Sequence, residues 1–235
     1  MMARRRIVLA LLVLFLVCDI LSAAPSLWVT SQELETFRTD GPAWEALLAT
    51  GAATMPAPSL STAGSPTPAM VLARALLYAK TGQEGYRLTV RHALGQVIGT
   101  ESSATDLLSI ARQLSTYVIA ADLIDLPTYD PPFNTSTWRP WLLQMRTRAV
   151  SGKTLLTAHA QSPGELGAAA GAARVAIARY VADQTDLGTA AGVFQAWLGD
   201  AGAPAGGFVF GPDLSWQCGG TPLPINPQGC LKDGY

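Results

Sequence analysis

Residues 159–180, HAQSPGELGAAAGAARVAIARY, decide the fold of this chain more than any other stretch. A polar segment containing His159 leads through a proline and a glycine into a helix composed almost entirely of small residues. Because small side chains allow neighbouring helices to approach closely, we expect an inner helix of a crowded helical assembly. Arg174 lies within it, and a buried guanidinium without a partner is costly. Arg174 must therefore reach solvent, pair with a carboxylate, or offer its planar fork to an anionic ligand.

Apolar residues at helical spacing predict further helices on both sides of this segment. The clearest stripe runs through residues 104–124, whose apolar face must be buried. Prolines and small polar residues predict loops at 51–67 and 126–133. No stretch alternates as a strand does, which predicts an all-α fold of helical hairpins and leaves bundles, solenoids and toroids open. Two short helices are expected near the N-terminus, one opened by Thr30 with Glu33 and one opened by Pro42. Further helices are expected at 68–80 and 84–98, from near Ser136, at 167–182, and from Asp186, which is predicted to be the cap of the last one.

The first 24 residues have the layout of a secretory signal. Three arginines at 4–6 precede an unbroken apolar run at 7–17, and small residues at 22–24 offer a cleavage site. The apolar run is too short to span a bilayer comfortably. We therefore expect residues 1–24 to be removed and the protein to be secreted or periplasmic, without stable membrane insertion afterwards. An uncleaved anchor and a lipoprotein attached at Cys18 are the alternatives.

The charge of the remaining chain argues against a nucleic-acid partner. Without residues 1–24 the chain keeps 13 basic and 16 acidic residues, a net charge near −3. Proteins that bind nucleic acid carry a basic patch or stripe. A mildly acidic surface still permits a local basic cleft, so an acidic substrate is not excluded.

Two cysteines, Cys218 and Cys230, lie in a Gly/Pro-rich C-terminal segment that follows residue 199. An exported protein allows them to form a disulfide that pins this segment. Free thiols or a zinc site are the alternatives, although a single Cys pair without nearby His is a poor zinc set. A long non-helical loop on a helical scaffold is more often a binding surface than a spacer.

The sequence carries no HExxH, CxxC, GxxxxGK[ST] or GxSxG motif, so we expect neither a metal nor a cofactor. His92 lies mid-helix and is interpreted as a surface residue. Trp216 either stacks on a sugar ring or fills the core. The candidate site residues are the polar groups in or beside loops: His159, Glu165, Arg174, Trp216 and Gln217.

Several segments, in order, resemble secreted bacterial proteins that carry an alginate lyase-like domain. Upstream segments that fit the same group are ALLYAKTGQEGYRLTVRHALGQVIGTE (75–101) and YVIAADLIDL (117–126). The remaining segments are GKTLLTAHAQSP (152–163), GAAAGAARVAIARYVADQTDLGTAAGVFQAWLGD (167–200), FVFGPDLSWQ (208–217) and PINPQG (224–229). The resemblance covers most of residues 25–235, which we treat as one domain.

The resemblance implies an α/α toroid, a ring of helical hairpins around a groove, that cleaves uronate-containing polysaccharides by β-elimination. This chemistry needs a group that neutralises the uronate carboxylate, a base that removes the C5 proton, and an acid for the leaving oxygen. The resemblance suggests His159 as base or substrate contact and Arg174 as the partner of the uronate carboxylate or as a support for the residues that contact it. Trp216 would be the stacking platform, and Gln217 would line the groove.

The chain departs from the family pattern at a position that matters for catalysis. Gly164, Glu165 and Leu166 stand where the family has asparagines and a bulky residue. Glu165 neutralises a carboxylate only when protonated and otherwise repels it. The chain also ends at Tyr235, before the later helices of the ring, so we expect an incomplete toroid. An inactive or truncated relative that binds glycan is therefore an alternative, as is a helical-repeat adaptor, although helix and loop lengths vary too much for a 34-residue period.

Overall fold

The computed structural model describes residues 26–101, 106–162 and 164–197, which belong to two compact units. The first unit ends at Phe37 and contains the short helix α2 (Ser31–Thr36). The hydroxyl of Thr30 accepts from the backbone N–H of Glu33 at 3.1 Å, and the Glu33 carboxylate accepts from the N–H of Thr30 at 2.8 Å. This reciprocal pair is the capping box that the sequence predicts.

The second unit begins at Arg38 and opens with two hairpins whose bounds lie close to those predicted. Its first helices are α3 (Pro42–Ala52), α4 (Thr67–Thr81), α5 (Glu84–Val97) and α6 (Leu107–Leu123). Gly82 ends α4 with φ 70°, a left-handed conformation that glycine adopts without strain. The expected start of α6 at residue 104 is wrong, because extended Asp106 caps the helix by accepting from the N–H of Ser109 at 2.8 Å.

The proline-rich segment after α6 is helical, contrary to the predicted loop. It forms α7 (Leu126–Tyr129) and α8 (Pro131–Phe133), followed by a π-helical turn, η2 (Asn134–Trp138), and by α9 (Arg139–Thr147). Each short helix has proline at its start, where the missing N–H has no helical partner to lose. The Asp130 carboxylate caps α8 by accepting from the N–H of Phe133 at 3.2 Å.

The last described helices are α10 (Leu155–Gln161), α11 (Glu165–Tyr180) and α12 (Gln184–Trp197). α10 lies in a segment that the sequence analysis interpreted only as polar. α11 is the small-residue helix. The cap of α12 is Asp183, whose carboxylate accepts from the N–H of Asp186 at 3.0 Å, rather than the predicted Asp186.

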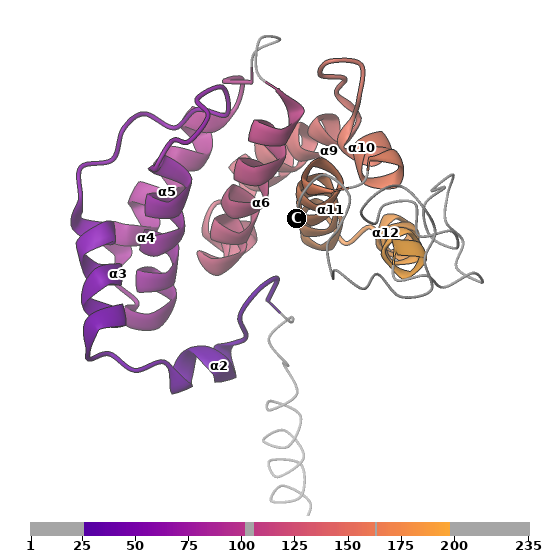
Figure 1. Cartoon of the computed structure of the whole chain (residues 1–235). Helices are drawn as coiled ribbons and strands as arrows, with labels where there is room; N and C mark the ends of the chain where they lie inside the picture. The colour runs from indigo at the N-terminus through magenta and orange to yellow at the C-terminus, as the bar shows by residue number, and fades with distance from the viewer. Residues whose placement is uncertain (1–25, 102–105, 163, 198–235) are drawn as a thin grey trace, which may run out of the picture. The chain divides into compact units, whose positions relative to one another are not determined.

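Within the second unit, α6 and α11 form the centre of the packing. Figure 1 shows α6 between α4 and α11, and these are its main packing partners. α11 in turn packs against α10 and α12. The core between these helices includes Ile110, Leu114, Tyr117, Ala170 and Ile177, all fully buried. The prediction of an inner helix is thus met by α11.

The described residues form helices, turns and irregular connections and contain no strand, apart from one isolated bridge between Val150 and Lys153. The all-α prediction is therefore confirmed for this part of the chain. None of the helices in the described part is long and apolar enough to cross a bilayer.

Candidate functional site

His159 lies in the last turn of α10, and its side chain is buried. Thr154 caps the N-terminus of α10, since its hydroxyl accepts from the N–H of Thr157 at 3.1 Å. Directly opposite the imidazole stands Gly171 of α11. A Cβ atom at that position would lie 2.8 Å from His159 Cδ2, closer than real Cβ contacts allow. The glycine therefore lets α10 and α11 approach closely enough to enclose the ring.

Arg174 lies one turn further along α11 and is also buried, with 4% of its surface exposed. Its Nε and Nη2 both donate to Asp186 Oδ1, at 3.0 and 2.6 Å. Its Nη1 lies 3.4 Å from His159 Nδ1. A guanidinium can only donate, so Nδ1 accepts and the proton of the neutral imidazole is on Nε2. Of the three fates that the sequence allowed for Arg174, pairing with a carboxylate is the one observed.

A second arginine completes this cluster. Arg146 of α9 donates from Nη1 to Asp183 Oδ2 at 2.9 Å and to Asp186 Oδ2 at 3.1 Å. We refer to His159, Arg146, Arg174, Asp183 and Asp186 as the buried ion cluster, after His159 and Arg174, which are buried; the other three side chains are partly exposed. Two arginines and two aspartates balance in charge, so the cluster leaves no net positive charge for an anionic ligand.

The pKa of His159 is lowered to about 4, first because burial penalises the imidazolium and second because Arg174 repels it. Asp186 acts in the opposite direction but does not reverse the shift. His159 is therefore neutral near pH 7, the form that a base needs. Because the ring is enclosed and 4% exposed, however, a substrate proton does not reach it in this conformation.

Trp197 at the end of α12 also packs against the imidazole of His159. The two rings meet edge to face, with their centroids 5.6 Å apart. Gly167 of α11 makes room for the indole, since a Cβ at this position would lie 2.9 Å from Trp197 Cζ2. α10, α11 and α12 are thus joined around His159.

Glu165 lies apart from the buried ion cluster, in the first turn of α11. Its carboxylate forms an ion pair with Arg112 of α6, and about a third of the Glu165 side chain is exposed. The structure therefore gives Glu165 an ion pair between α11 and α6.

The other predicted residues cannot be compared with this geometry. Trp216, Gln217, Cys218 and Cys230 lie outside the described residues, as do residues 1–24. The structure brings His159 and Arg174 together and leaves Glu165 on a different helix interface. The sequence predicts a carboxylate as one possible partner of Arg174 but does not point to Asp186 or to Arg146. An arginine and an aspartate 40 residues apart give no local signal.

The described residues contain no group of three or more His, Cys, Asp and Glu side chains suited to hold a metal ion. Comparison of the chain with models of known protein families, with curated proteins and with solved structures finds no match.

Proposed function

We propose that this chain is an exported, alginate lyase-like helical protein whose ligand is a uronate-containing polysaccharide, and that it binds this glycan without cleaving it. Support for the ligand comes from the segments of residues 75–234 that resemble alginate lyase-like proteins and from the helical hairpins of the described residues. Support for binding without cleavage comes from the contacts of the candidate catalytic residues.

The observation that carries this choice is the enclosure of His159 and Arg174. Elimination requires a base in contact with the C5 proton and a cation or amide in contact with the uronate carboxylate. His159 is enclosed by Gly171, Arg174 and Trp197, and Arg174 is paired with Asp186. Both residues thus fit a role in holding α10, α11 and α12 together.

An active polysaccharide lyase is the second candidate function. The observation in its favour is that His159 is neutral at pH 7, as a general base must be. This candidate requires the enclosure to open, and it requires an acid from another part of the chain. A helical-repeat adaptor has no comparable observation in its favour.

One pair of measurements separates these functions. The purified protein is incubated with alginate and with other polyuronates, and ultraviolet absorbance of the unsaturated product is followed. Binding of the same polymers is measured in parallel by isothermal titration calorimetry. Binding without absorbance is the result we expect. Absorbance that grows with time establishes the lyase, whereas neither signal removes the glycan proposal altogether.

A further inference from the structure

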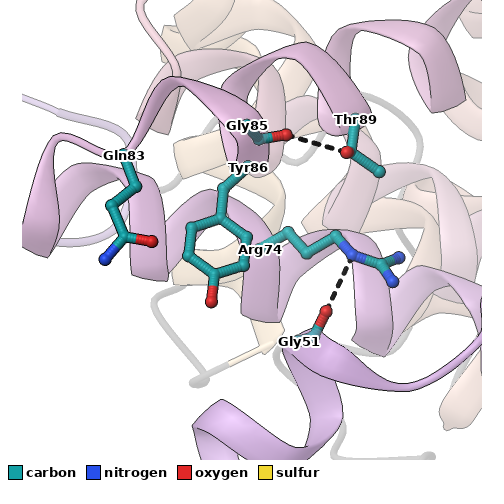
Figure 2. A pocket seen from close by; sticks show the side chains of 6 residues that line it. All are labelled: Gly51, Arg74, Gln83, Gly85, Tyr86 and Thr89. Atoms are coloured by element: carbon teal, nitrogen blue, oxygen red, sulfur yellow. Dashed lines mark hydrogen bonds between the residues drawn. The ribbon is translucent and has the colours of Figure 1, made fainter.

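A second polar site lies away from the buried ion cluster, where α3, α4 and α5 meet. It is a pocket of about 290 Å³ that opens to solvent. Figure 2 shows its six lining residues: Gly51, Arg74, Gln83, Gly85, Tyr86 and Thr89. The volume lies at the lower limit of ligand pockets, which range from roughly 300 to roughly 1,000 Å³. It suits one sugar unit or another small molecule rather than a long chain segment.

Arg74 supplies the charge of this pocket. Its side chain extends from α4 to the C-terminal end of α3, and 8% of its surface is exposed. Nε donates to the carbonyl of Gly51 at 3.0 Å, and Nη2 donates to the carbonyl of Ala53 at 2.7 Å. Gly51 allows this approach, because a Cβ atom at its position would overlap the Leu77 side chain of α4.

The guanidinium is incompletely satisfied by these contacts. Nη1 is buried and makes no hydrogen bond within the described residues, and Arg74 forms no ion pair there. The carbonyls at the end of α3 carry only the partial negative charge of a helix C-terminus, roughly half a unit. A buried cation therefore remains partly uncompensated, in contrast to Arg174 with its carboxylate.

The other lining residues offer groups that bind sugars. Tyr86 is half-buried and presents an aromatic ring beside Arg74, and Gln83 is exposed (Figure 2). Neither side chain makes a hydrogen bond within the described part of the chain. Thr89 donates to the carbonyl of Gly85 at 2.8 Å and closes the upper edge of the pocket in this view.

We propose that this pocket binds a carboxylate-bearing ligand, and that the ligand is a uronate unit of the acidic polysaccharide. The carboxylate supplies the negative charge that Arg74 lacks, and the Tyr86 ring receives the apolar face of the sugar. Nη1 of Arg74 is shielded from solvent. The guanidinium therefore attracts the ligand carboxylate through the wall of the pocket, because a charge attracts at a distance and needs no direct contact. The identity of the ligand rests on the proposed function, whereas the preference for a carboxylate rests on Arg74.

The test fills the pocket without disturbing the core. Gly85 lines the pocket in α5, its backbone does not have a positive φ, and a Cβ atom there meets open space. Gly85→Leu therefore places a side chain in the pocket. Gly188→Leu is the matched control, since Gly188 is also an exposed helical glycine with open space around it, and it lies in α12. Gln83→Ala is a second lining variant at an exposed position.

Binding is measured by calorimetry with a trimannuronate, with the neutral trisaccharide maltotriose, and with free glucuronate. We expect the unsubstituted protein to bind the trimannuronate and not maltotriose. Gly85→Leu should weaken this binding roughly tenfold or more, because the leucine side chain occupies the space that the sugar needs. Gln83→Ala should weaken it less, and Gly188→Leu should leave it unchanged.

The outcomes separate the site from the function. Trimannuronate binding that is equal in all variants overturns the pocket and leaves the proposed function standing. Binding of free glucuronate that is lost in Gly85→Leu, without binding of trimannuronate, supports a carboxylate pocket and overturns the polysaccharide. Absence of binding by any of the three sugars overturns both.

Discussion

Arg174 and Asp186, twelve residues apart on two successive helices, are joined by two hydrogen bonds that converge on one carboxylate oxygen. The second oxygen of Asp186 is held by Arg146 at 3.1 Å. Asp186 thus connects α9, α11 and α12 at a single side chain. A buried pair of this kind contributes little compared with an apolar replacement of both partners, but removal of one partner leaves an uncompensated charge.

The first prediction concerns this charge. Arg174→Met should lower the free energy of unfolding by about 1 to 3 kcal/mol, because Asp186 loses its closest cation and keeps only Arg146. Arg179→Met on the same helix is the control, since Arg179 is half-buried and forms no ion pair within the described residues. It should change the free energy by less than about 1 kcal/mol. Urea unfolding followed by circular dichroism measures both, and equal effects would contradict the structural role of the pair.

The second prediction concerns the close contact between α10 and α11. Gly171→Ala should destabilise the protein by about 1 to 3 kcal/mol, although alanine is the better helix former, because its methyl group meets His159. Gly188→Ala is the matched control in open space and should stabilise by up to about 1 kcal/mol. Thermal unfolding checks the signs. A stabilised Gly171→Ala variant would show that the helices are not held this closely.

The third prediction follows from the pKa of His159, which is about 4 in the folded protein and about 6.5 in an unfolded chain. Between these pH values the unfolded chain binds a proton that the folded protein does not. The free energy of unfolding should therefore fall as the pH is lowered from 6.5 to 4, by an amount on the order of 3 kcal/mol. Urea unfolding over this pH range measures the slope.

His159→Gln tests the origin of this pH dependence, because it removes the titrating group. The variant should have a smaller slope between pH 6.5 and 4 than the unsubstituted protein, whatever its absolute stability. The pKa of Asp183 is lowered by the N–H of Asp186 and by Arg146. Asp183 therefore loses its stabilising charge only below about pH 4, the usual pKa of an aspartate, which is outside the range of this test. An unchanged slope in His159→Gln would assign the effect to other groups.

The helices of the second unit were predictable where the sequence carries a strong local signal. The apolar stripe of α6 and the glycine stop after α4 depend on residues within one or two turns, and both elements are found. The seven-residue helix α10 was missed because it is short and its cap is a Thr154–Thr157 pair without a glutamate. The prolines of α7 and α8 favour a loop by local pattern, although proline is tolerated in the first turn of a helix and is found there in both.

The candidate site could be predicted only in part, because it depends on long-range contacts. The pairing of Arg174 with a carboxylate follows from the cost of burying a guanidinium, but the choice of Asp186 depends on how α12 packs on α11. No local pattern in the sequence marks Arg74 as a site residue, since it lies in an ordinary amphipathic helix. Its burial results from the carbonyls at the end of α3, 21 and 23 residues away.

The last prediction compares a half-buried tyrosine, Tyr180, with a fully buried one, Tyr117. The hydroxyl of Tyr180 donates to Asn134 Oδ1 at 2.8 Å, whereas the fully buried Tyr117 hydroxyl has no hydrogen-bond partner within the described residues. Tyr180→Phe leaves the buried Asn134 oxygen unsatisfied and should cost about 1 to 3 kcal/mol. Tyr117→Phe removes an unsatisfied hydroxyl and should be neutral or stabilising.

Both substitutions delete one oxygen atom from a tyrosine on a central helix, so each serves as the control for the other. Burial raises the pKa of both hydroxyls, so both are protonated near neutral pH and the comparison is between neutral groups. Asn134→Leu in the Tyr180→Phe background should recover part of the loss, since it replaces the stranded amide by an apolar side chain. Urea unfolding of the four proteins gives the signs. If Tyr117→Phe were the more destabilising of the two, its hydroxyl would have a partner, and the packing of α6 against its neighbours would have to differ from that described.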